Sequence, residues 1–248
     1  MKHVLANHTP RWTRRKDARP QELLESALAV FSEKGFSGAR LEDVAKNAGV
    51  SKGTVYLYYP NKEELLKAVV LEHVSPIVTE AAEQVDESES STTQIREAIH
   101  LWWARYGSTE LSALTKIVMF EAHAFPELGQ FFHQKVITPW WNFLESLLQR
   151  GIRRGEFSDI DTEYAAKVLC APLVTLSLWK RTMDPCCNLD TDPLRYIEAH
   201  IQMVLNGLTC PKNRSSNRPP SAQTGAAALP GADSESASVF TLPVPPRR

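Results

Sequence analysis

The sequence predicts an all-α protein, and two observations carry this prediction. Between Pro20 and Leu208 the apolar residues recur every three or four positions, and no segment shows the sustained alternation of a β-strand. The 248 residues include only 11 glycines, few of them in turn-like pairs, which argues against a many-stranded β fold. With 43% hydrophobic and 23% charged residues, most of the chain is typical of globular proteins.

The first three expected helices have clear ends. The first helix follows Pro20, because proline suits a first helical turn, and Gly35 ends it. Apolar spacing predicts a short second helix over residues 41–48, which Gly49 stops, and a third over residues 51–58. Pro60 closes the third helix.

The remaining helices are longer. Asn61 followed by Glu64 is a variant capping box that should open a fourth helix, and Pro76 should kink or restart this helix. Five further stripes at helical spacing follow, over residues 95–106, 111–122, 126–147, 161–183 and 197–208. About nine helices are therefore expected in total.

Composition divides the chain into four parts. Residues 1–16 form a basic arm that we expect to be flexible, residues 17–77 a small helical domain, and residues 78–210 a larger one. Residues 211–248 contain seven of the sixteen prolines, six serines and few large apolar residues. Such a segment buries too little surface to offset its ordering entropy, so a disordered tail is expected.

Targeting features point to the cytoplasm. The basic N-terminal residues lack the apolar core of a secretory signal. The most apolar stretch, residues 164–179, is shorter than the roughly 20 residues that span a bilayer, so no membrane partner is expected. The four cysteines lack CxxC spacing, which fits a reducing compartment.

Residues 41–62, LEDVAKNAGVSKGTVYLYYPNK, have the pattern of a helix-turn-helix. Ala45 is small where two helices cross, Gly49 permits the turn, and Val50 and Val55 anchor the second helix. The outward side of that helix carries groups that suit phosphates and base edges: Ser51, Lys52, Gly53, Thr54, Tyr56 and Tyr58. The net charge of the whole chain is −1, but residues 1–67 hold 12 Lys+Arg against 8 Asp+Glu, so the basic excess is local.

Residues 20–70 resemble the DNA-binding domain of the TetR/AcrR family of transcriptional regulators. The residues that match the family pattern are Leu23, Leu24, Ala27, Phe31, Gly35, Phe36, Val44, Ala45, residues 48–51 and 53–56, Tyr58, Tyr59, Lys62, Glu63 and Leu65. Two positions depart from it: Arg40 stands where the family often has a Ser or Thr cap, and Tyr59 where it usually has Phe. We expect Arg40 to contact a phosphate instead, and Tyr59 to bury its ring.

The resemblance implies how DNA is bound. Lys52, Gly53, Thr54, Tyr56 and Tyr58 would line the major groove of double-stranded operator DNA. Lys62 would bind a phosphate together with the N-terminal amides of the fourth helix. The protein would then be associated with the nucleoid when it is bound to DNA.

The resemblance also implies that residues 78–210 form a homodimer and enclose a small effector. The segment 164–179 is apolar almost all round, so we expect it to pair with the last helix in a four-helix bundle across a two-fold axis. The candidate interface residues are Leu169, Leu173, Leu176, Ile197, Ile201 and Leu205. Such a dimer implies a palindromic operator.

Aromatic residues indicate the effector site, because five of the six tryptophans lie between residues 102 and 179. The candidate lining residues are Trp102, Trp103, Tyr106, Phe120, His123, Trp140 and Trp179. A hydrophobic or aromatic effector suits them. As the family implies, the effector would move the fourth helix as a lever and release a repressor from its operator.

Three functions are alternatives to a repressor that a small effector releases. Adjacent Cys186 and Cys187, in a loop after Pro185, indicate a thiol-based redox sensor on the same fold. A ligand-independent activator on the same fold cannot be separated from a repressor by one sequence, although repression is the more common outcome in the family. An enzyme is disfavoured, because G-x-S-x-G, H-E-x-x-H and glycine-rich phosphate loops are missing and the histidines are scattered. We therefore expect no catalytic residue, metal or cofactor.

Overall fold

The computed structural model describes residues 19–187 and 190–209, and these residues confirm the all-α class. Within them the only β pairing is an isolated bridge between Phe157 and Thr209. The α-helices are α1 (Arg19–Gly38), α2 (Leu41–Asn47), α3 (Lys52–Tyr58), α4 (Lys62–His73), α5 (Ser75–Glu83), α6 (Ser91–Trp102), α7 (Ala113–Glu121), α8 (Pro126–Phe132), α9 (Thr138–Arg153), α10 (Thr162–Thr182), α11 (Asp184–Cys187) and α12 (Pro193–Leu208). Between them lie the π-helical turns η2 (Trp103–Gly107) and η4 (His133–Ile137) and the 3₁₀ turn η3 (Glu110–Ser112). The basic arm and the C-terminal tail lie outside the described residues.

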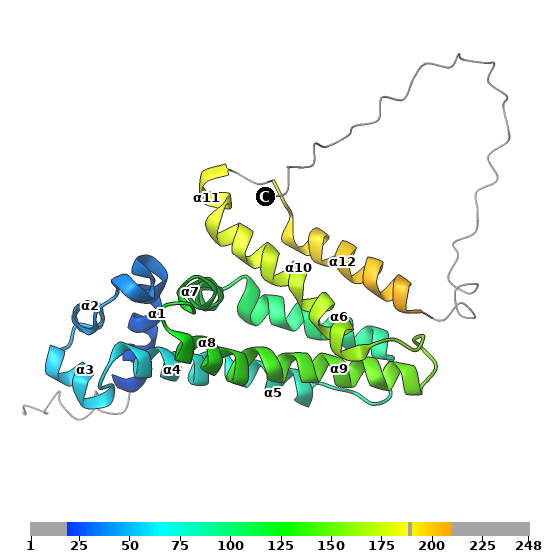
Figure 1. Cartoon of the computed structure of the whole chain (residues 1–248), viewed down its shortest axis with the longest axis horizontal. Coiled ribbons are helices and arrows are strands. Elements are labelled where there is room, and N and C mark those ends of the chain that lie inside the picture. Colours follow the sequence, from blue (N-terminus) through cyan, green and yellow to red (C-terminus); the bar gives the residue numbers. More distant parts are fainter. Residues whose placement is uncertain (1–18, 188–189, 210–248) are drawn as a thin grey trace, which may run out of the picture.

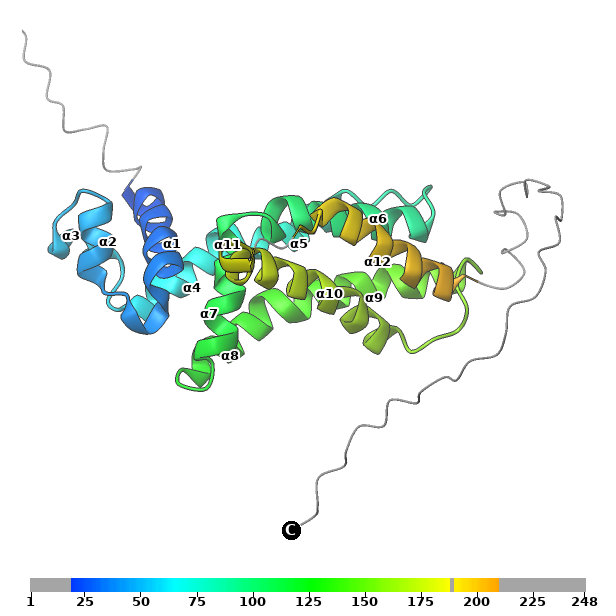
Figure 2. The same cartoon turned by 90° about the horizontal axis from the view of Figure 1, so that it is seen from above.

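The helices form an elongated molecule. Helices α1, α2 and α3 lie at one end, and α4 leads from them toward a bundle that includes α5, α6, α9, α10 and α12 (Figure 1). Helices α7 and α8 lie between the two parts, with α7 seen almost end-on in Figure 1 and crossing the long axis in Figure 2. No helix among the described residues is long and apolar enough to cross a membrane.

The helix-turn-helix depends on two left-handed glycines and two caps. Gly35 (φ 70°) ends the regular part of α1, and Gly49 (φ 65°) makes the turn between α2 and α3. The Val50 amide donates to the Ala45 carbonyl at 3.0 Å, which closes this turn. Ser51 caps α3, and Asn61 caps α4 by accepting from the Glu64 amide at 2.8 Å. The ends expected from the sequence are therefore confirmed.

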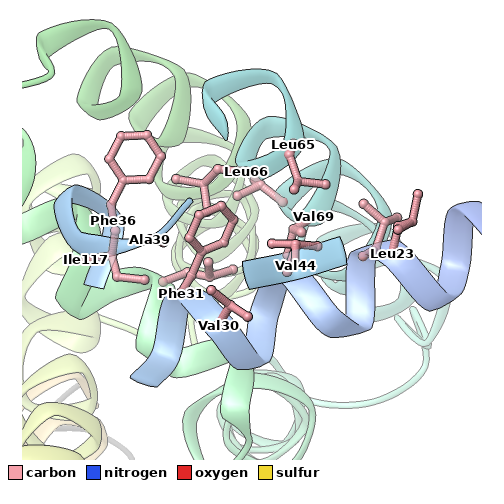
Figure 3. Close-up of a cluster of buried hydrophobic side chains, with 14 of the residues drawn as sticks. Leu23, Val30, Phe31, Phe36, Ala39, Val44, Leu65, Leu66, Val69 and Ile117 are labelled. Atoms are coloured by element: carbon pink, nitrogen blue, oxygen red, sulfur yellow. The ribbon is translucent and has the colours of Figure 1, made fainter. Parts of the chain in front are cut away.

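One hydrophobic core continues from this domain into α7 and α8. It contains Phe31, Phe36, Val55 and Val69 together with Ile117 of α7, and Figure 3 shows Ile117 beside Phe36. Tyr106, Leu114, Leu128 and Phe132 belong to the same cluster. The helix-turn-helix domain is therefore packed directly against the helices of the larger domain.

Two prolines shape the larger domain. Pro76 lies in the first turn of α5, so the chain restarts there after α4, as the sequence predicted. Pro139 has no N–H to donate to the Lys135 carbonyl, and the helix widens to the π-turn η4 just before α9. The Ser75 hydroxyl donates to the freed Lys135 carbonyl at 3.4 Å.

The predicted dimer interface needs correction. All six candidates, on α10 and α12, are buried inside a second core formed within one chain with α6 and α9. The most apolar stripe of a helix is the one that packs in its own protomer, which is why the stripe chosen from the sequence faces inward. The large apolar side chains that α10 and α12 expose are Tyr164, Val168, Trp179, Leu194 and Met203.

Candidate DNA-binding surface and effector cavity

Helix α3 separates a buried side from an exposed one. Val55 is fully buried, while Tyr56 (43%), Leu57 (80%) and Tyr58 keep large apolar groups exposed to solvent. Lys52 and Gly53 are also exposed, and Thr54 is half-buried. The reading face predicted from the sequence therefore lies on the surface. Leu57 was missed, because the contact residues were predicted from their polar groups.

Ser51 and Thr54, two of the residues predicted to contact DNA, also form hydrogen bonds with each other at the start of α3. The Thr54 amide donates to Ser51 Oγ at 3.1 Å, and the two hydroxyls lie 2.8 Å apart. These hydrogen bonds occupy part of the capacity of the two hydroxyls, which were predicted to bond DNA.

The Lys52 ammonium forms an ion pair with Glu42 of α2 and lies 5.3 Å from the centre of the Tyr56 ring. The hydrogen bond between them raises the pKa of Lys52 and lowers that of Glu42. The ammonium is exposed, so a DNA phosphate can compete with Glu42 for it.

Arg40 does not cap α2 with its side chain, which is exposed. The start of α2 is instead held by Asp43, which accepts from the Arg40 amide at 3.2 Å and pairs with Lys34 at 2.8 Å. The ion pair with Lys34 lowers the pKa of Asp43. The Arg40 side chain thus stays exposed at the start of α2.

Lys62 is placed differently from the expectation. Its ammonium donates to the carbonyls of Phe36 (2.8 Å) and Ser37 (3.2 Å), and it lies 4.6 Å from the centre of the Phe36 ring. It therefore binds the carbonyl end of α1, where a cation is favourable. A phosphate contact would require the ammonium to leave these carbonyls.

The larger domain contains a cavity of about 410 Å³ that is lined by residues of α6, η2, α7, α8, η4, α9 and α10. Its lining is mainly apolar and includes Trp102, Tyr106, Val118, Met119, Phe132, Val136, Ile137, Trp140, Trp141, Leu173, Val174 and Leu178. The exposed lining residues Met119 and Ala171 mark where it opens to the surface.

Three of the seven effector candidates, Trp102, Tyr106 and Trp140, line this cavity. Trp103 is buried in the second core, because adjacent residues on a helix point in different directions. Phe120, His123 and Trp179 are exposed and lie outside the lining.

The missed lining residues of α7 are Thr115, Val118 and Met119. Their i, i+3, i+4 spacing was the available signal, but the lining residues were predicted from aromatic side chains.

Apart from Lys167, the polar side chains that line the cavity are neutral. The Tyr106 hydroxyl bonds Thr115 Oγ1 at 2.5 Å, and Thr175 Oγ1 donates to the Ala171 carbonyl at 2.9 Å. Burial raises the pKa of Tyr106, and it raises the pKa of the Cys170 thiol to about 12. The cavity therefore offers an apolar volume with few polar groups, typical of small-molecule sites.

Cys186 and Cys187 lie in the one-turn helix α11 rather than in a loop. Both are exposed, and their sulfur atoms are 3.3 Å apart. The hydrogen bond from Cys186 raises the pKa of Cys187, which lowers its thiolate fraction at neutral pH.

A helix-turn-helix domain packed on a helical domain with an apolar cavity defines a class of transcriptional regulators. Residues 23–69 match the family described as bacterial regulatory proteins, tetR family, and residues 85–185 match the tetracyclin repressor-like C-terminal domain. The HTH-type transcriptional regulator YfiR of Bacillus subtilis is 30% identical over 161 residues, which cover 58% of this chain and 71% of that protein. The chain belongs to the TetR family of bacterial regulatory proteins.

Further relatives agree with this assignment. The fatty acid metabolism regulator protein of Bacillus subtilis is 25% identical over 169 residues, covering 66% of this chain and 86% of that protein. The crystal structure of the regulator FadR from Bacillus subtilis, in complex with stearoyl-CoA, has the same fold, with a TM-score of 0.66 and 21% identity over 76% of this chain and 98% of that chain. The first of these proteins is a regulator of fatty acid metabolism and the second is a transcriptional regulator.

Proposed function

We propose that the protein is a homodimeric repressor that a small hydrophobic effector releases from a palindromic operator. The observation that carries this proposal is the position of α7. Its residues Thr115, Val118 and Met119 line the cavity, while Ile117 packs in the same core as Phe36 of the DNA-reading domain. A ligand that displaces α7 must therefore disturb the packing of that domain.

The DNA-reading role rests on α3. Its exposed Tyr56, Leu57 and Tyr58 offer phenols and an apolar contact to base edges, and Lys52 and Arg40 offer charges to phosphates. Leu57 would contact a thymine methyl group. A major groove is wide enough to admit this helix.

Dimerisation is proposed through the outward side of α10 and α12. Tyr164, Val168, Leu194 and Met203 are large apolar side chains that remain exposed on these two helices. A second copy of the chain, placed across a two-fold axis, would cover them and present two α3 helices to successive major grooves. This arrangement predicts inverted half-sites about one helical turn apart.

The cavity is proposed as the effector site. A volume of about 410 Å³ falls within the range of small-molecule pockets, and it exceeds by far the space that one benzene-sized ligand needs. The FadR structure in complex with stearoyl-CoA supports an effector with an acyl chain. Movement of α4, which connects the reading domain to α5, would change the spacing of the two α3 helices.

A thiol sensor is the second candidate, because the sulfurs of Cys186 and Cys187 lie 3.3 Å apart at the surface. Hydrogen peroxide would oxidise both thiols to a disulfide and be reduced to two waters, and an alkyl hydroperoxide would be reduced to an alcohol and one water. DNA binding that is unchanged by peroxide and by alkylation would remove this candidate.

The direct test is to incubate the purified protein with sheared genomic DNA of its source organism and sequence the retained fragments. We expect one enriched palindromic site, from which acyl compounds release the protein. The protein should first be unfolded and refolded to remove any effector carried through purification. If no sequence is then enriched, the proposed function is wrong.

A further inference from the structure

Lys167 of α10 is the charged residue among the described residues that line the cavity. Its side chain is 32% exposed, so it lies at the rim and not deep inside. The apolar lining includes Trp141 and Val174. A ligand that fills the cavity must therefore pass within reach of one ammonium group.

Glu163 and two aromatic rings hold this ammonium in place. It donates to Glu163 Oε1 at 2.6 Å, one helical turn earlier, and lies 4.6 Å from the Tyr164 ring and 5.3 Å from the Trp141 ring. The rings restrict the side chain without neutralising its charge. The pair with Glu163 raises the pKa of Lys167, so the amine stays protonated at neutral pH.

Glu163 is an easily replaced partner. Its side chain is 64% exposed, and an exposed ion pair between residues one turn apart contributes little. When Glu163 turns away, water solvates its carboxylate at little cost. The ammonium, in contrast, is half-buried against aromatic rings and gains from a new anion on its inner side.

We propose that Lys167 binds the acid group of an amphipathic effector whose apolar body fills the cavity. Glu163 occupies this position in the empty protein and is displaced by the ligand. The neutral hydroxyls and thiol of the interior, on Tyr106, Thr115 and Cys170, leave the ammonium as the group that selects for charge. This inference rests on the proposed function, because it assumes that the effector enters this cavity.

A matched pair of probes tests it: dodecanoate and 1-dodecanol, both below their aggregation limits. Binding is followed by the fluorescence of the lining tryptophans Trp102, Trp140 and Trp141. For the unaltered full chain we expect dodecanoate to bind about tenfold more tightly than dodecanol, the ratio of one charge-assisted hydrogen bond.

Three variants separate charge from shape. Lys167→Met keeps the length of the side chain and should weaken dodecanoate to the affinity of dodecanol, with dodecanol unchanged. Lys167→Arg should retain the preference, and Glu163→Gln should tighten dodecanoate only. Lys116→Met, at an exposed lysine of α7 outside the lining, is the matched control and should change neither affinity.

Equal binding of both probes to the unaltered protein would overturn the inference, as would a loss of both in Lys167→Met with its melting temperature unchanged. Binding of neither probe would overturn it as well. The proposed function is judged separately by operator capture: release of the operator by acid and alcohol alike would sustain the function and reject the role of Lys167.

Discussion

The carboxylate of Glu121, the last residue of α7, accepts two hydrogen bonds from Ser37 near the end of α1. The Ser37 amide donates to one oxygen at 3.2 Å and the Ser37 hydroxyl to the other at 2.5 Å. Beside this joint the Phe125 ring meets Phe36 edge-on at 4.9 Å. Helix α7, which lines the cavity, is therefore hydrogen-bonded through its last residue to α1 of the DNA-reading domain.

Removing this joint should uncouple the two domains. We expect Glu121→Ala to retain both operator and effector binding, but to reduce the effector-induced loss of operator affinity about fivefold, which corresponds to ~1 kcal/mol of coupling. Fluorescence anisotropy of labelled operator, with and without effector, measures this factor. Glu127→Ala in the first turn of α8 is the control. If the coupling is unchanged in Glu121→Ala, the hydrogen bonds between Ser37 and Glu121 do not transmit the effect of the ligand to the DNA-reading domain.

Tyr56 should be needed for DNA recognition and not for folding. Its ring is 43% exposed, so Tyr56→Ala should leave helical content and melting temperature nearly unchanged. Specific operator affinity should fall by about 1–3 kcal/mol, the usual value of one base contact. Circular dichroism and anisotropy report the two effects. A loss of fold would instead identify the ring as part of the core.

Lys62 should contribute to stability through the carbonyls that it binds. We expect Lys62→Met to lower the free energy of unfolding by about 1–2 kcal/mol, because the ammonium bonds the end of α1. Urea titration measures this loss. The opposite pattern, unchanged stability with weaker binding to all DNA sequences and a smaller salt dependence, would favour the phosphate contact expected from the sequence.

An ion-pair cluster between α6 and α12 should make stability depend on pH. Arg96 and His100 hold the pKa of Glu198 below its ordinary value of 4.5. This contribution is therefore present above pH 4.5 and is lost as the pH falls through the lower folded-state pKa. Glu198→Gln should cost at most about 1 kcal/mol at neutral pH, because the pair is partly exposed. The difference in melting temperature from the unaltered protein should vanish in acid; a constant difference would contradict this.

Local signals in the sequence were sufficient for the helix ends. Gly35, Gly49, the Asn61 cap and the restart at Pro76 each act within a few residues, so their effect does not depend on distant packing. The reading face of α3 was also predictable, since burial of Val55 fixes which residues point outward.

Tertiary packing decided the rest. Leu169 and Ile201 are as apolar as an interface requires, but only the positions of α9 and α6 show that they face the protomer's own core. Phe120 is 74% exposed, although its aromatic side chain would suit the lining of a cavity. Lys62 found carbonyl partners 25 residues and more away along the chain, which no local pattern contains.

We expect a ligand in the cavity beside α7 and α10 to control DNA binding. Val174→Trp, at a half-buried lining residue, should fill the cavity without overpacking the core. The decisive measurement is the anisotropy of labelled operator, titrated with the effector, for the unaltered protein and for this variant. We expect the unaltered protein to release the operator and the variant to retain it at every effector concentration. Equal release by both would contradict the account, because the effector would then act at another site.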